Sequence, residues 1–167
     1  MKREDVRQFL KDGADALDLY FDSGRITEFN SLSDKKFPFA WVESLKTSTE
    51  FGGTGATLID SWSVTIHIAK QDKMDNLQSD YEAIVDECDQ IARKLIWQYN
   101  YILQSTDSTQ SATDTLSDNT TLKRFAYSLI TMEGIDREPF IKKHADDLTG
   151  VILTFTLNVP DAVNVCP

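Results

Sequence analysis

The chain has 167 residues, of which 41% are hydrophobic and 10% aromatic, so it has enough apolar side chain to fold around a core and is not disordered as a whole. Its 17 Lys and Arg residues against 27 Asp and Glu residues leave a net charge of −10, and such a surface repels phosphate backbones and anionic lipids. We therefore expect a single domain over residues 1–167 that neither grips nucleic acid nor binds a membrane surface.

Targeting and cysteine patterns support this expectation. The sequence holds no run of about 18 apolar residues, so we expect no membrane span. The N-terminal stretch MKREDVRQFLKDG is charged throughout and is not typical of a signal peptide. Cys88 and Cys166 stand far apart, whereas zinc sites and disulfide frameworks use paired cysteines. The composition is typical of a protein made in a reducing cytoplasm.

Residues 3–21 predict an amphipathic helix. Apolar side chains recur at steps of three and four residues with charges between them, namely Val6, Phe9, Leu10, Leu17 and Phe21. Gly13 weakens this helix slightly, and Gly24 suits a C-terminal cap. The following stretch up to Pro38 predicts a loop.

Two strands are expected next. In residues 39–48, alternation places Phe39, Trp41 and Leu45 on one face with Glu43. Residues 61–72 alternate more regularly, with Trp62, Val64, Ile66 and Ile68 on an apolar side and Ser63, Thr65 and His67 on a polar side. We expect these strands to form an antiparallel hairpin.

The glycine-rich segment TEFGGTGATLIDS, residues 49–61, would form the tip of that hairpin. Its three glycines invite comparison with nucleotide-binding loops. A phosphate loop, however, ends in Gly-Lys-Ser or Gly-Lys-Thr, and a dinucleotide fingerprint leads from a strand into a helix. Here a strand follows the glycines, so a flexible hairpin tip is the favoured interpretation.

Residues 75–104 predict the main helix, for which Asp75 or Asn76 can serve as N-cap. Its apolar stripe is wide enough to lie across a sheet. The stripe consists of Leu77, Tyr81, Ile84, Val85, Cys88, Ile91, Ala92, Leu95, Ile96, Tyr99 and Ile102. Because Cys88 falls on this stripe, we expect it to be a small buried hydrophobe.

The polar segment Gln104–Thr121 is low in complexity and predicts a long loop or arm, mobile in an isolated subunit and ordered, if at all, in an assembly. Strands are expected at residues 124–134 and 150–159, joined by a loop over 135–150. The predicted order is helix-strand-strand-helix-strand-strand. It indicates an α+β fold, an antiparallel sheet with helices packed on one face.

Candidate catalytic and metal-binding residues are few. His67 lies on the polar side of its strand, and His144 lies in a polar loop beside Asp146 and Asp147. A catalytic triad or a metal site needs several such groups to converge, and nothing in the spacing predicts that they do. The sequence also lacks the Gly-x-Ser-x-Gly, His-Glu-x-x-His and Cys-x-x-Cys motifs. We expect no enzyme activity, no catalytic residues, no cofactor and no metal.

Three tryptophans, Trp41, Trp62 and Trp97, could suggest a ligand stack. Their positions favour core packing or a subunit interface instead, since aromatic side chains are common in both.

Four features of the chain together resemble a known group of proteins. They are the N-terminal amphipathic helix, the strand FPFAWVES entered through a proline, DSWSVTIHIAKQD running into YEAIVDECDQIARKLIWQY, and the ending LTGVILTFTLNVPDAVNVCP. In the order of their elements and in their residue patterns, they resemble the small neck and tail-ring proteins of tailed bacteriophages. The likeness is to phages of Bacteroidota, including the crAss-like phages.

This resemblance implies a structural virion protein, a tail-completion, tail-terminator or head–tail connector subunit that joins portal to tail. Such subunits form closed rings, often sixfold or twelvefold, and contact neighbouring portal, connector or tail proteins. DNA passes through the ring without specific binding, and a negative lumen suits that passage. The implied location is the virion neck or tail, after assembly in the host bacterial cytoplasm, with no membrane partner.

Two alternatives stay open. One is another small structural role in the same particle, such as an adaptor or a tube protein. The other is a soluble enzyme or ligand-binding protein with an unrecognised pocket. In the ring interpretation, Cys166 belongs to a short tail that contacts a neighbour, and the strand before it is an integral part of the sheet.

Overall fold

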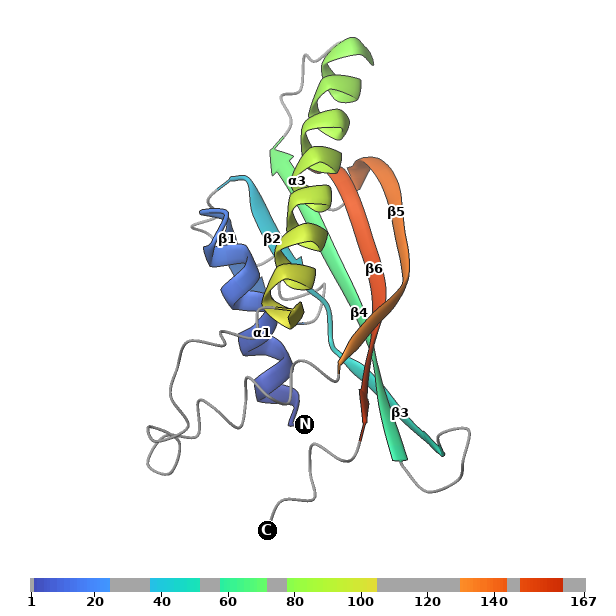
Figure 1. Ribbon diagram of the computed structural model, residues 1–167. Coiled ribbons are helices and arrows are strands. Elements are labelled where there is room, and N and C mark those ends of the chain that lie inside the picture. The colour runs from blue at the N-terminus through green and yellow to red at the C-terminus, as the bar shows by residue number, and fades with distance from the viewer. Residues whose placement is uncertain are drawn as a thin grey trace.

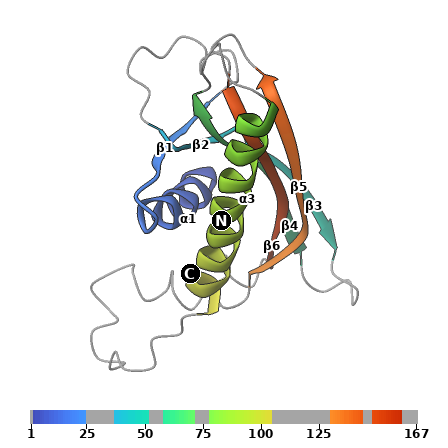
Figure 2. The ribbon, with the colours of Figure 1, turned by 90° about the horizontal axis from the view of Figure 1, so that it is seen from above.

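The computed structural model describes residues 2–24, 37–51, 58–71, 78–104, 130–143 and 148–160. These residues form, in chain order, α1 (Arg3–Asp15), β1 (Tyr20–Ser23), β2 (Phe39–Val42), β3 (Lys46–Phe51), β4 (Leu58–Gln71), α3 (Gln78–Gln104), β5 (Thr131–Lys143) and β6 (Leu148–Pro160). Both helices lie on one face of a six-stranded sheet formed by the described residues (Figure 1 and Figure 2). The α+β class and the placement of the helices are thus confirmed.

The sheet has the strand order β1-β2-β4-β6-β5, and β3 also pairs with β4. Strands β2 and β3 lie end to end along one side of β4, where β2 pairs with its second half and β3 with its first half. These pairings confirm the predicted hairpin. Strands β2, β3 and β5 run antiparallel to their neighbours β4 and β6, but β1 pairs with β2 in parallel, so the sheet is mixed.

The first helix is shorter than the sequence predicted, because the chain leaves α1 through a left-handed residue. Asp18 has φ 53, and the Leu19 N–H donates to the Ala14 carbonyl at 3.1 Å, which is the bonding of a Schellman motif. The chain then turns and continues as β1. Gly24 is therefore not a helix cap; its N–H donates to the Val42 carbonyl at 3.0 Å. Phe21 still packs against the core, so its apolar spacing reflected burial and not helix.

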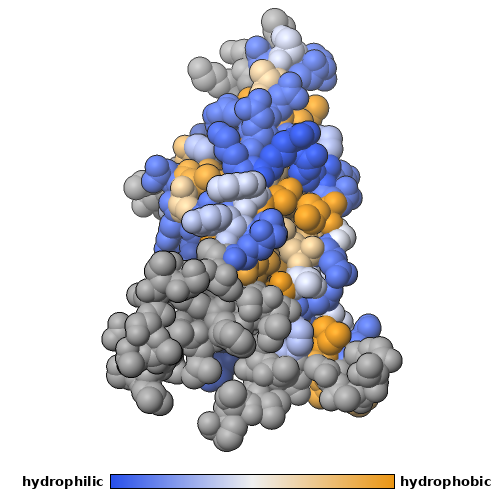
Figure 3. All heavy atoms as spheres, viewed as in Figure 1, coloured by the Kyte–Doolittle hydropathy of each residue, from blue (hydrophilic) through white to orange (hydrophobic). Residues whose placement is uncertain are grey.

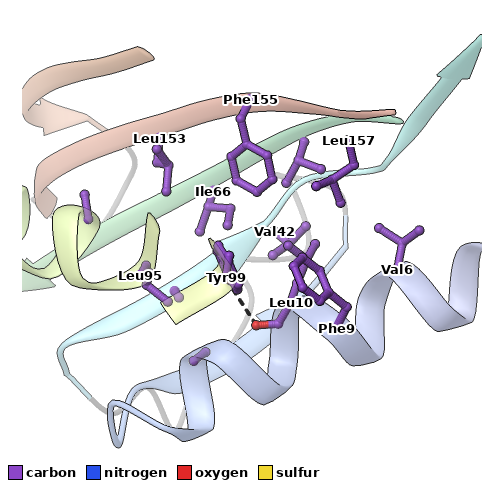
Figure 4. Close-up of a cluster of buried hydrophobic side chains, with 14 of the residues drawn as sticks. Val6, Phe9, Leu10, Val42, Ile66, Leu95, Tyr99, Leu153, Phe155 and Leu157 are labelled. Carbon is purple, nitrogen blue, oxygen red and sulfur yellow. Dashed lines mark hydrogen bonds between the residues drawn. The ribbon is translucent and has the colours of Figure 1, made fainter. Parts of the chain in front are cut away.

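The main core lies between the helices and the sheet and is centred on Tyr99 of α3 (Figure 4). The Tyr99 hydroxyl donates to the Leu10 carbonyl of α1 at 3.1 Å. Its ring centroid lies 5.2 Å from that of Phe9 and 5.8 Å from that of Phe155. Both helices and β6 therefore meet at one buried aromatic side chain, which fixes how α1 crosses α3.

Strand β5 extends through Lys143, although the sequence predicted a loop from residue 135 onward. Its pairing with β6 is interrupted between Glu133 and Asp136, where Gly134 has φ 61, and it contains Pro139. A proline and a glycine bulge are tolerated because β5 pairs, among the described strands, with β6 alone. Such residues look like loop signals in a sequence.

Strand β6, the predicted closing strand, is confirmed and lies inside the sheet between β4 and β5. Both of its edges are hydrogen-bonded within the subunit, which explains its regular alternation. The polar segment predicted as a long loop or arm begins at Gln104, the last residue of α3, and the rest of it lies outside the described residues, as does Cys166.

Candidate interaction surface

A hairpin arm extends past the helices at the lower right of Figure 1; it consists of β3 and residues 58–63 of β4. All six residues of β3 are exposed, whereas residues 58–61 of β4 are half-buried and Trp62 is buried. Cross-strand side-chain bonds hold the arm together, since the Thr49 hydroxyl donates to Asp60 at 2.7 Å. The Ser61 hydroxyl likewise bonds Asn158 of β6 at 2.8 Å. The arm is thus an ordered edge of the sheet, in which β3 is exposed and residues 59–63 of β4 also pair with β6.

The distal end of this arm is apolar and acidic. Phe51, at 75% exposure, lies opposite Leu58 on the helix side of the sheet, and Asp60 follows on the same face. Glu50 is exposed on the other face. Between residues 50 and 60 the sequence has no Lys or Arg. We call Glu50, Phe51, Leu58 and Asp60 the arm end.

A second exposed aromatic group lies on α3. Trp97 and Tyr101 are 64% and 55% exposed, and their rings stack with centroids 5.4 Å apart and planes 11° from parallel. One turn earlier, Arg93 and Lys94 are exposed, and the Arg93 Nε donates to the Asp89 carboxylate at 2.8 Å. We call Arg93, Lys94, Trp97 and Tyr101 the α3 patch.

Charge is segregated along α3. Its acidic residues, Asp80, Glu82, Asp86, Glu87 and Asp89, all precede its two basic residues, Arg93 and Lys94. The N-terminal half of the helix shows a strongly hydrophilic surface in the upper part of Figure 3. Of these charged side chains only Asp80 lies in the first turn, where the helix dipole favours an anion. The α3 patch is consequently a small basic and aromatic surface on an acidic protein.

The structure places His67 in a second, smaller core, not on a polar face as the sequence predicted. It is 4% exposed on the helix-free side of the sheet, and its Nε2 lies 2.7 Å from Oε1 of Glu43. Its ring meets that of Phe140 edge-on at 6.0 Å. The neighbouring members of this core are Phe39, Trp41, Ala69, Phe140 and Leu148. A histidine in these surroundings serves packing and a hydrogen bond.

The alternation predicted for residues 39–48 fails at one point, since Leu45 does not share a face with Phe39 and Trp41. Leu45 is 4% exposed in the main core, whereas those two aromatic residues belong to the smaller core. The break between β2 and β3 lies between them, where the Glu43 N–H donates to the Thr65 carbonyl at 3.0 Å. The break reverses which side chains face the helices.

The other candidate residues give no convergent site among the residues that the structure describes. Cys88 is fully buried, and desolvation, with a smaller effect of Glu87, raises the pKa of its thiol to about 12, so it is confirmed as a small buried hydrophobe. His144, Asp146 and Asp147 lie outside the described residues, as does the glycine segment 52–57. Within the described ranges, no three His, Cys, Asp or Glu side chains gather to hold a metal ion.

The three tryptophans are not together. Trp41 and Trp62 are buried at 3% and 5% exposure, in the smaller and the main core respectively. Trp97 is exposed and belongs to the α3 patch, so core packing is wrong for this residue and a subunit interface stays a prediction. Sequence reasoning missed the arm end, although Phe51 beside the glycine segment was the available signal.

A shallow depression with a volume of about 510 Å³ lies between the end of α1 and the start of β2, open to solvent. Its lining consists of Asp15, Asp18, Leu19, Tyr20, Phe37 and Pro38. These side chains offer carboxylates and aromatic surface but no nucleophile of the Ser, Cys or His type. His67 and Cys88 take no part in it.

Two further findings bound the functional argument. Neither of the described helices combines the length and the apolar composition that crossing a membrane requires. Compared with known proteins, the sequence matches no protein-family model and no curated protein. A function for this chain is therefore inferred from the arm, the α3 patch and the resemblance described above.

Proposed function

We propose that this protein is a structural virion protein, a ring-forming subunit of the neck or tail of a tailed phage that joins portal to tail around the path of the DNA. One observation carries the proposal: an ordered hairpin arm extends from the sheet with an exposed aromatic end. Phe51 is 75% exposed and lies opposite Leu58, so the arm end presents apolar surface that a neighbouring subunit can cover.

Ring geometry gives the arm its purpose. A cyclic assembly uses heterologous contacts, in which one surface of each subunit meets a different surface of the next. An arm that leaves the body of one subunit can make such a contact without moving the core. The outer edges of β3 and β5, which pair with no other described strand, also offer backbone groups to a neighbouring subunit.

Overall charge supports the same role. A ring around DNA must let the polymer slide, and a protein with a net charge of −10 attracts no phosphate backbone. The same charge keeps free subunits apart by repulsion, so assembly depends on specific local contacts.

The purified full-length protein tests this proposal directly. Light scattering across a range of concentrations, together with negative-stain electron microscopy, should show closed rings. Six copies of an 18.9 kDa chain make particles of about 113 kDa, and twelve copies make about 227 kDa. A tube protein would give open helical tubes instead. A monomer at all concentrations that is also missing from purified phage particles would refute the proposal.

A further inference from the structure

We propose that the arm end of one copy docks on the α3 patch of the next copy and that this contact is the repeating interface of the assembly. The inference rests on the proposed ring and names the two surfaces that build it. Each surface belongs to a different element of the subunit, the arm to the sheet and the patch to the outer side of a helix.

Most of the large exposed hydrophobic side chains in the described part of the chain belong to these two surfaces. Phe51, Trp97 and Tyr101 are three of the five large hydrophobic side chains that are exposed in the described part of the chain. Trp97 and Tyr101 already stack on each other, so they form a flat surface that loses little side-chain entropy when a partner covers it. Trp and Tyr are also the side chains most enriched at the energetic centres of interfaces.

Charge selects the partner of each surface. Asp60 lies on the same face of the arm as Phe51, and the α3 patch carries Lys94 and Arg93, which is paired with Asp89. Two arm ends in contact would bring two Asp60 carboxylates together, and two α3 patches would bring two Lys94 ammonium groups together. The unlike pairing alone places opposite charges within a Debye length, about 8 Å at physiological salt, so it is favoured between copies that otherwise repel.

An unlike pairing also has the right consequence for assembly. Each added copy uses one arm and one patch and leaves one of each free, so growth continues until the chain of subunits closes or extends as a filament. A contact between like surfaces would stop at two copies. The proposed interface is thus sufficient for a ring without any further contact.

A mixing experiment tests the pairing. Phe51→Ser removes the anchor of the arm, and Trp97→Ala with Tyr101→Ala removes the platform; all three side chains are exposed, so circular dichroism should show an unchanged fold. Loss of an aromatic interface anchor weakens association by about tenfold to a hundredfold. Each variant alone should therefore be a monomer of 18.9 kDa at concentrations where the unmodified chain forms larger particles.

Mixed in equal amounts, the two variants should form a heterodimer of about 38 kDa, twice the 18.9 kDa chain, and nothing larger. The intact arm of one meets the intact patch of the other, and the defective arm and patch are left at the two ends. The matched control is Ile135→Ser with Ile141→Ser, which removes similar exposed apolar area from β5 and should assemble normally.

Charge reversal gives an independent readout. Asp60→Lys and Lys94→Glu should each weaken assembly, and the double variant should restore it. This pairing would be overturned if both aromatic variants assembled as well as the unmodified chain. It would also be overturned if the mixture stayed monomeric while the unmodified chain formed rings. Either outcome would leave the proposed function standing. An unmodified chain that is monomeric at every concentration would overturn this pairing, and its absence from purified phage particles as well would overturn the proposed function.

Discussion

Replacement of Gly13 by alanine should destabilise the protein, although alanine is the better helix former. A methyl group at Gly13 would lie 2.2 Å from Cε1 and 2.6 Å from Cδ1 of Tyr99. The Tyr99 ring cannot easily move aside, because it is fully buried, bonded to the Leu10 carbonyl and in contact with Phe9 and Phe155. Gly13 is thus required by the close approach of α1 to α3.

The two opposing effects can be compared. Higher helix propensity favours alanine by about 1 kcal/mol, whereas added bulk in a packed core costs about 1–3 kcal/mol and sometimes more. A separation of 2.2 Å is far below any normal carbon–carbon contact, so the cost is at the upper end of that range. We expect a net loss of about 1–2 kcal/mol, which lowers the melting temperature by about 2–8 °C for a domain of this size.

Urea unfolding followed by tryptophan fluorescence measures the change as a lower midpoint with an unaltered slope. The matched control repeats Gly13→Ala in a Tyr99→Leu background, where the ring atoms that clash are gone. There the substitution should be neutral or stabilising by up to about 1 kcal/mol, so the two sites should show strong coupling. Equal effects in both backgrounds, or stabilisation of the unmodified chain, would refute this account of the packing.

Three further outcomes are expected. Burial raises the pKa of Cys88 to about 12 from an ordinary 9.0, so the stability that comes from burying the neutral thiol is complete below pH 9 and is lost as the pH rises from 9 to 12. The urea midpoint should therefore fall less across that pH range in Cys88→Ala than in the unmodified chain. Gly134→Ala should cost about 1 kcal/mol for backbone strain alone, since φ is 61 with open space around it, and Gly134→Asn should cost less in the same assay. Gly150→Ala should leave little soluble folded protein, because the methyl would lie 2.0 Å from the Ile68 carbonyl oxygen in a central strand; normal yield and circular dichroism would contradict this.

Elements with one buried and one more accessible side were predictable, because their apolar residues recur with the period of a helix or a strand. In β6, Val151, Leu153 and Phe155 are buried, and the residues between them are half-buried. In α3, Cys88 and Tyr99 lie on the predicted stripe and are fully buried. Tertiary packing and local pattern agree in these elements, so the order of the long strands and the main helix followed from the sequence.

Elements that face two separate cores, or whose apolar spacing resembles that of another element, were not predictable. All four residues of β2 are buried, since Ala40 faces the helices and Trp41 the smaller core, and nothing in the sequence announces a second core. Residues 20 and 21 were assigned to a helix because Phe21 continues the helical spacing, yet the left-handed Asp18 turns the chain into β1. Asp is less common than Gly in that conformation, so the helix end had no obvious marker.

The interaction surface could not be predicted in full from the sequence. The sequence shows which residues are apolar, but it does not show which of them the rest of the subunit covers. Trp62 and Trp97 are the same residue type in regular elements, but one is 5% exposed and the other 64%. The difference arises from geometry, since α3 turns one side to the sheet and Trp97 occupies the other. Phe51 is exposed for a related reason, because β3 continues past the part of the sheet that the helices cover. Ordered aromatic side chains left uncovered on two elements, with opposite charges beside them, are therefore the observations from which the contact between copies is proposed.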